Sequence, residues 1–168
     1  MLQEIVEKEQ TQRNAELYAL QAQINPHFLY NTLNSIRYFA KIYKAPEIRE
    51  ITAALIQLSK ASLSSEKFIC IRQELELTEQ YLAIQKMRYG DIAEVTMEME
   101  EELGDCLIPR FSIQPAVENA LFHGILPKGN GKIEVKVHRS GAGIEIQIRD
   151  DGVGIEKEQM EEINERLK

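Results

Sequence analysis

Residues 25–43 read NPHFLYNTLNSIRYFAKIY, and this stretch sets the pattern for the first half of the chain. After Pro26, apolar side chains return at spacings of four and three residues, at Leu29, Leu33, Ile36, Ala40 and Tyr43. At about 100° per residue these positions form one stripe along a helix, which we expect to be buried. His27 lies roughly 160° from the centre of that stripe, so it is predicted to point outward. Asn31 follows it one turn later on the same side.

A second helix is predicted to begin at Pro46, because proline suits the first turn of a helix. Its apolar face carries Ile48, Ile51, Leu55 and Leu58, with Ser62 as a further candidate. Two helices with a short connection predict an antiparallel hairpin. Because such a hairpin buries little surface alone, we expect two chains to dimerise into a four-helix bundle. Residues 2–22, rich in Glu and Gln, predict a coiled-coil helix or a frayed terminus.

The second half has a different composition, since residues 1–90 contain only Pro26, Pro46 and Gly90 as breakers. All the other glycines and prolines lie beyond, which predicts a mixed α and β region. We expect helices over 72–89, over 108–125 with a break near Gln114-Pro115, and over 157–167. Alternating apolar residues predict strands over 94–100, 132–138 and 143–150, the last two joined by a turn centred on Ser140-Gly141.

Charge and composition exclude several classes of protein. The 168 residues include 20 Lys and Arg against 27 Asp and Glu, a net charge of -7, which argues against nucleic-acid binding. No apolar run is long enough to span a membrane, and no signal peptide is expected at Met1. Cys70 and Cys106 are too few for a disulfide framework or a metal cluster.

Three segments carry residues suited to chemistry. In residues 25–34, His27 can act as a nucleophile near neutral pH, although a lone exposed histidine is more often structural. In residues 114–124, the amide oxygen of Asn119 suits Mg²⁺, although the residue could equally hydrogen-bond within a core helix. In residues 150–155, Asp150 can accept a hydrogen bond from an amino group, and Gly152 and Gly154 allow a close backbone approach. An ordinary turn between a strand and a helix is the alternative for that last segment.

Taken together, the three segments resemble sensor histidine kinases of the LytS/YesM-like class. The segment NPHFLYNTLN resembles their phospho-accepting helix, and the other two resemble the N box and first glycine box of Bergerat-type ATPases. The resemblance extends from about Ala19 onward. It implies an α+β fold: a helical hairpin, dimerising to a four-helix bundle, followed by an incomplete Bergerat-type α/β sandwich that binds ATP.

The resemblance also implies roles for individual residues. His27 matches the phosphorylated histidine, and Asn31 matches a position that in related kinases aids dephosphorylation of the partner. Asn119 matches the asparagine that binds Mg²⁺ and, through it, ATP. Asp150 matches the aspartate that reads the adenine amino group. The glycines beneath the base are matched by Gly152 and Gly154.

Three departures from the family pattern affect these expectations. Many histidine kinases have an acidic residue directly after the histidine, whereas this chain has Phe28, so no general base is identified. Many carry Lys where Phe122 stands, so a phosphate contact is either missing or supplied elsewhere. The family also continues into a lid and a second glycine box beyond Lys168, so we expect a truncated fragment with an incomplete nucleotide site and an unpaired sheet edge.

The implied organisation is a signalling helix over 1–22, a dimerisation and phosphotransfer hairpin over 23–68, and part of an ATPase domain over 69–168. The implied partners are a second copy and a response-regulator receiver domain, with the fragment on the cytoplasmic side of a bacterial plasma-membrane sensor. Activity should fall as His27 becomes protonated in acid. A non-catalytic dimerisation and docking module is the alternative. A Bergerat ATPase without a phosphohistidine is disfavoured, because Pro115 stands where its general base would be and Glu118 is given no catalytic role.

Overall fold

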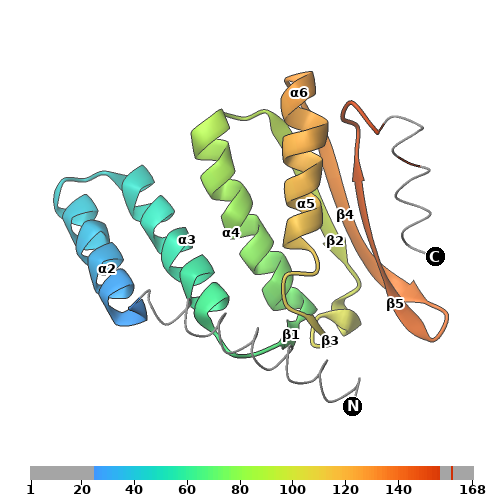
Figure 1. Cartoon of the computed structure of the whole chain (residues 1–168), viewed down its shortest axis with the longest axis horizontal. Coiled ribbons are helices and arrows are strands. Elements are labelled where there is room, and N and C mark those ends of the chain that lie inside the picture. Colours follow the sequence, from blue (N-terminus) through green and yellow to red (C-terminus); the bar gives the residue numbers. More distant parts are fainter. Residues whose placement is uncertain (1–24, 156–159, 161–168) are drawn as a thin grey trace, which may run out of the picture. The chain divides into compact units, whose positions relative to one another are not determined.

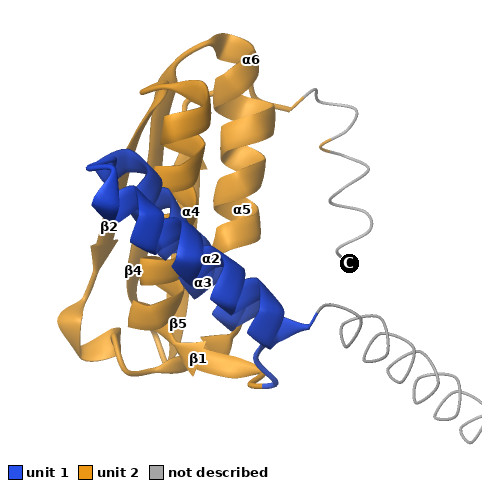
Figure 2. Cartoon of the chain, turned by 90° about the vertical axis from the view of Figure 1, so that its left-hand side faces the viewer, with its two compact units in different colours: residues 1–65 blue, residues 66–168 orange. Residues whose placement is uncertain are grey.

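The computed structural model describes residues 25–155 and residue 160. The chain divides into two compact units, residues 1–65 and 66–168, and each is described by itself (Figure 2). The helices predicted over 2–22 and 157–167 lie outside the described residues, except at Met160, which is helical. No described helix combines the length and the apolar character needed to cross a membrane.

The first unit contains a hairpin of two helices, α2 (Pro26–Ile42) and α3 (Pro46–Leu63) (Figure 1). Proline occupies the first turn of both helices, as the sequence predicts. The connection is only three residues long, and Lys44 within it adopts a positive φ of 52°. The predicted hairpin is thus present.

The predicted apolar stripes are only partly covered in the single chain. Ala40 is buried, but Ile36 is 43% exposed and Tyr43 is 78% exposed. On α3 the buried residues are Thr52, Ala54 and Ile56, whereas Ile48 is half exposed and Leu55 is 38% exposed. In the single chain these apolar faces are covered only in part, because a two-helix hairpin covers only a narrow line of each helix.

The second unit is a mixed α/β domain. Its elements in chain order are β1 (Phe68–Cys70), α4 (Ile71–Tyr89), β2 (Ala93–Met99), η1 (Glu101–Leu103), β3 (Leu107–Pro109), α5 (Gln114–Asn119), the π-helical segment η2 (Ala120–Ile125), α6 (Leu126–Lys128), β4 (Gly131–Ser140) and β5 (Gly143–Asp150). The α4 helix ends at Gly90, whose φ of 81° suits glycine.

The main sheet has the order β2-β4-β5. Strands β2 and β4 are parallel, with Val95 opposite Ile133, and β4 and β5 are antiparallel, with Val135 opposite Ile148. Helices α4, α5 and α6 lie over one face of this sheet (Figure 1). Alternate residues of β4 are fully buried beneath them, while the intervening Lys132 and Glu134 are exposed.

Two adjoining clusters of buried residues make up the core of this unit. The larger contains Ile71, Leu75, Leu103, Ile108, Ile113, Val117, Val135 and Val137. The smaller contains Ala120, Leu121, Ile125 and Ile133. Val117 of α5 belongs to the larger cluster, and Ala120, Leu121 and Ile125 of η2 belong to the smaller one, so core packing fixes the chain on both sides of Asn119.

The predictions for the second unit hold for most elements and fail for one. The helix over 72–89 and the strands over 94–100, 132–138 and 143–150 are confirmed within one or two residues, with the β4–β5 turn formed by Gly141 and Ala142. The helix predicted over 108–125 is wrong in its first part. There, β3 pairs with β1, Phe111 turns the chain with a φ of 60°, and the helix begins only at Gln114. Pro115 is the physical reason, since it suits a first turn and not a helix interior.

Candidate functional site

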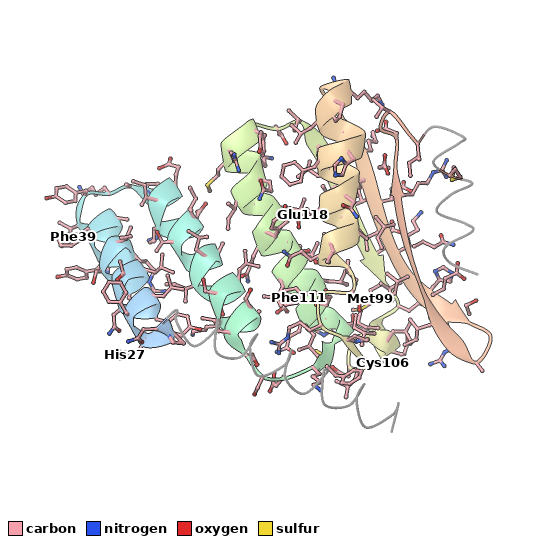
Figure 3. All side chains as sticks on the ribbon, viewed as in Figure 1. His27, Phe39, Met99, Cys106, Phe111 and Glu118 are labelled. Atoms are coloured by element: carbon pink, nitrogen blue, oxygen red, sulfur yellow. The ribbon has the colours of Figure 1, made fainter. Side chains whose placement is uncertain are left out.

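The start of α2 is built to present His27. The Asn25 side-chain oxygen accepts hydrogen bonds from the backbone N–H groups of His27 at 3.1 Å and Phe28 at 3.2 Å. These bonds satisfy two donors that a helix start leaves without partners within the helix. His27 is exposed at this end of the helix (Figure 3). The sequence NPH therefore encodes a capped, well-ordered turn that holds an imidazole in solvent.

Asn31 lies beside His27 on the exposed side of α2, as the helical spacing predicts. The Asn31 side-chain nitrogen is 3.3 Å from both Nδ1 and Nε2 of His27. An amide N–H can donate only to a ring nitrogen that carries no proton. Asn31 is therefore placed to orient a His27 ring whose facing nitrogen carries no proton.

The second part of the site is α5, and its start is held by a buried carboxylate. Glu74 of α4 is completely buried. Its two oxygens accept the backbone N–H groups of Phe111 and Ile113, each at 3.1 Å. Glu74 thus fixes the turn from which α5 begins, five residues before Asn119.

Asn119 is the last residue of α5, and its side chain is exposed. Directly after it the chain forms the π-helical segment η2. Such segments are uncommon and are found frequently at functional sites. This irregular turn carries the chain from Asn119 to Gly124, where it meets the glycine-rich turn.

Glu118 projects toward α4 (Figure 3). Burial raises the pKa of the Tyr81 hydroxyl on α4, and the neighbouring Glu118 carboxylate raises this pKa further. Glu118 therefore lies beside the Tyr81 hydroxyl of α4.

The glycine-rich turn after β5 docks directly on η2. The Val153 N–H donates to the Gly124 carbonyl oxygen at 3.1 Å. A Cβ atom on Gly124 would lie only 2.5 Å from Oδ1 of Asp150, and one on Gly152 would overlap the backbone of Gly124. The two backbones can approach this closely only because both positions are glycine.

Asp150 and Gly154 complete the turn. Oδ1 of Asp150 accepts the Gly152 N–H at 2.9 Å, which fixes the carboxylate against Gly124. Gly154 adopts a φ of 75°, a conformation that other residues rarely take, and there is open space around it. The two glycines therefore serve different needs: Gly152 provides room and Gly154 provides a left-handed turn.

Asp151 ties this turn to the start of β4. Its Oδ1 accepts the Lys132 N–H at 2.7 Å, and its Oδ2 lies 3.2 Å from Nζ of Lys128. Nζ of Lys128 also donates to the Asp151 carbonyl oxygen at 2.5 Å. The Lys132 N–H and then the Lys128 side chain hold the pKa of Asp151 below its ordinary value.

The donor set fits a nucleotide with its Mg²⁺ ion. Within residues 25–155, no group of three or more His, Cys, Asp and Glu side chains is placed to bind a metal ion by itself. Mg²⁺ that accompanies a nucleotide needs only one or two protein ligands, because phosphate and water supply the others. The exposed amide oxygen of Asn119 is a suitable ligand of this kind.

The structure therefore brings together part of the predicted site. Asn119, Asp150, Gly152 and Gly154 all belong to the α5–η2 segment or to the turn that docks on it, whereas His27 and Asn31 form a separate group in the first unit. Sequence reasoning assigned no role to Gly124, Glu74 or Asp151. Of these only Gly124 had a sequence signal, since glycine is unfavourable inside a helix unless something approaches it closely.

Comparisons with known proteins agree with these motifs. A family model described as "Histidine kinase" matches residues 15–93, and one described as "Histidine kinase-, DNA gyrase B-, and HSP90-like ATPase" matches residues 108–168. The sensor histidine kinase YesM of Bacillus subtilis is 34% identical over 158 residues, which are 93% of this chain and 27% of YesM. The sensor histidine kinase YpdA of Escherichia coli is 39% identical, with 89% of this chain and 26% of YpdA covered.

A third relative, the sensor protein LytS of Staphylococcus saprophyticus, is 35% identical, with 90% of this chain and 26% of LytS covered. The chain thus spans about a quarter of the length of these relatives. The two family models lie in the order of the two structural units, with the phosphohistidine motif in the first and the N box and glycine box in the second. By its motifs, its α/β domain and these relatives, the chain belongs to the sensor histidine kinases of the LytS/YesM class.

Proposed function

We propose that this chain is the kinase portion of a two-component sensor, in which the γ-phosphoryl group of ATP is transferred to His27 and then to an aspartate of a response regulator. The observation that carries the proposal is the contact of the Asp150–Gly154 turn with η2, through the Gly124 and Gly152 backbones. This contact supports the proposal because it brings Asp150, the proposed reader of adenine, against Gly124, five residues after Asn119, the proposed Mg²⁺ ligand.

The adenine end of the nucleotide is assigned to the glycine turn. A carboxylate can accept a hydrogen bond from the exocyclic amino group of adenine. Asp150 is held for this task by the Gly152 N–H and by its packing against Gly124. Because the glycines have no side chains, a flat base can lie close to the backbone there.

The phosphate end is assigned to Asn119. Mg²⁺ bound there would offset charge on the phosphates, which is the main electrostatic requirement of phosphoryl transfer. Asn119 needs no large movement to reach a ligand, since its side chain is already exposed at the end of α5. The buried Glu74 keeps the start of that helix in place.

At His27 an unprotonated ring nitrogen attacks the γ-phosphorus, and a new N–P bond forms as the bond from that phosphorus to the bridging oxygen of ADP breaks. The proton of the imidazole then leaves to solvent or to a base. Asn31 orients the neutral ring before attack. Phosphoryl transfer depends mainly on such positioning and on neutralised charge.

A non-catalytic dimerisation and docking module is the second candidate. It is favoured by the apolar side chains that the α2–α3 hairpin exposes, which include Tyr38, Phe39, Ile42 and Tyr43. Both proposals include a homodimer formed through the hairpin and a receiver domain as partner. We also assign the chain to the cytoplasmic part of a membrane-anchored sensor, as the resemblance to the LytS/YesM class implies.

Nucleotide binding separates the two candidates. The kinase proposal predicts that the chain binds Mg-ATP in equilibrium dialysis and that Asp150→Asn weakens binding at least tenfold. Asp105→Asn, an exposed aspartate in the turn before β3, is the matched control and should leave binding unchanged. A chain that binds no nucleotide contradicts the kinase proposal and supports the docking module.

A further inference from the structure

We propose that Arg88, at the end of α4, is a phosphate-binding residue of the nucleotide site. This inference rests on the proposed function and adds a residue to it. A triphosphate carries more negative charge than one Mg²⁺ ion offsets, so a cation near Asn119 is expected. Residues 114–125 contain neither Lys nor Arg, so the cation must come from a different element.

An aromatic contact joins α4 to the Asn119 segment. The rings of Tyr89 and Phe122 meet edge to face, with their centroids 5.9 Å apart and their planes at 84°. Phe122 follows Asn119 by three residues and lies in η2, which begins directly after Asn119. This contact brings the last turn of α4 against η2, the segment that follows Asn119.

Arg88 lies over the ring of Tyr89, one of the two partners in that contact. Its guanidinium carbon lies 4.9 Å from the centre of the Tyr89 ring, within the range of a cation–π interaction. Stacking on the ring restrains the guanidinium while its N–H groups stay available, and a planar guanidinium suits phosphate oxygens. Arg88 is therefore a restrained cation beside Tyr89, the residue through which α4 contacts Phe122.

The other cations around the site are already engaged. Lys128 pairs with Asp151 at 3.2 Å, and Lys132 pairs with Glu94 at 2.7 Å. On α4 itself, Lys86 pairs with Asp91 at 2.9 Å. Arg88, by contrast, is exposed and has no carboxylate within 4.0 Å among residues 25–155. A phosphate group would be a suitable partner for this guanidinium.

The test compares Mg-ATP with AMP in equilibrium binding. Arg88→Gln should weaken Mg-ATP binding about tenfold, as expected for the loss of a charge-assisted hydrogen bond, and leave AMP binding unchanged. Lys86→Gln removes a cation two residues away with the same change in net charge, and it should leave both affinities unchanged. An Arg88→Gln variant that binds Mg-ATP as tightly as the unaltered chain overturns the inference.

Second-site rescue separates ligand binding from a structural role. Phe122→Lys places an ammonium group three residues after Asn119, so adding it to Arg88→Gln should restore most of the Mg-ATP affinity. If Arg88 merely stabilised Tyr89, both nucleotides would bind more weakly and Phe122→Lys would rescue neither. If the unaltered chain binds neither nucleotide, the proposed function and this inference are both overturned. If the unaltered chain binds both nucleotides and Arg88→Gln binds them with the same affinities, the inference alone is overturned.

Discussion

Gly124 sets how closely the glycine turn approaches the Asn119 segment. We expect Gly124→Ala to weaken nucleotide binding at least tenfold, because the added methyl group would displace the Asp150 carboxylate. Overpacking of this kind also lowers the free energy of unfolding by about 1–3 kcal/mol. Gly143→Ala is the control, since a methyl group there meets only the Ser140 oxygen at 3.8 Å. Equal nucleotide affinities for the two variants would contradict the close contact at Gly124.

Asp151 provides a pH-dependent tether for the same turn. The pKa of Asp151 is lowered in the folded chain. Its contribution to the stability of the fold is therefore complete above the ordinary aspartate pKa and is lost as the pH falls through the lowered pKa. Carboxyl NMR titration should find the pKa of Asp151 below the ordinary value of 3.8. Lys128→Met should raise this pKa, and Lys86→Met should not. An Asp151 pKa that is ordinary in the unaltered chain would rule out the tether.

At the scale of the element, the start of α5 depends on Glu74. Glutamine in its place offers one acceptor and one donor to two backbone N–H groups, which leaves one buried N–H without a partner. Glu74→Gln should therefore lower the free energy of unfolding by about 1–3 kcal/mol in urea denaturation. Glu76→Gln changes an exposed residue of the same helix and should have no effect. Indistinguishable midpoints for the two variants would show that Glu74 does not hold the turn.

The elements also show what a sequence can predict. Helix α4 was predicted within one residue, because its apolar spacing is regular and Gly90 ends it. Strands β1 and β3 were missed because each has three residues and is stabilised by its pairing with the other. The parallel pairing of β2 with β4 joins segments separated by more than 30 residues, and no local pattern encodes it.

The residues of the candidate site were likewise predicted only in part. His27, Asn119 and Asp150 were singled out from short motifs, and the structure places them at a capped helix start, at the junction of α5 with η2 and at the end of β5. Their roles remain proposals. Glu74 and Arg88 were not singled out, because the roles given to them rest on contacts of α4 with Ile113 and Phe122. Residue spacing within one element does not reveal such contacts.

For the whole molecule, the exposed apolar surface of the hairpin predicts a dimer. Light scattering should give about twice the chain mass of 19.3 kDa. Replacing Ile36 and Ile48 together by Glu should yield a monomer, because two charges per chain would be buried at the interface. Gln57→Glu, at an exposed polar position of α3, should leave the dimer intact. A monomeric mass for the unaltered chain would contradict dimerisation through this surface.

The central claim joins the two units in one reaction, namely that phosphate from ATP is transferred to His27. The most direct test is incubation with Mg-ATP labelled at the γ-phosphate, followed by measurement of protein-bound label. We predict label that survives alkali and is lost in acid, that disappears in His27→Gln, and that persists in His123→Gln and His138→Gln. Label that persists in His27→Gln, or no label in the unaltered chain, would contradict the claim.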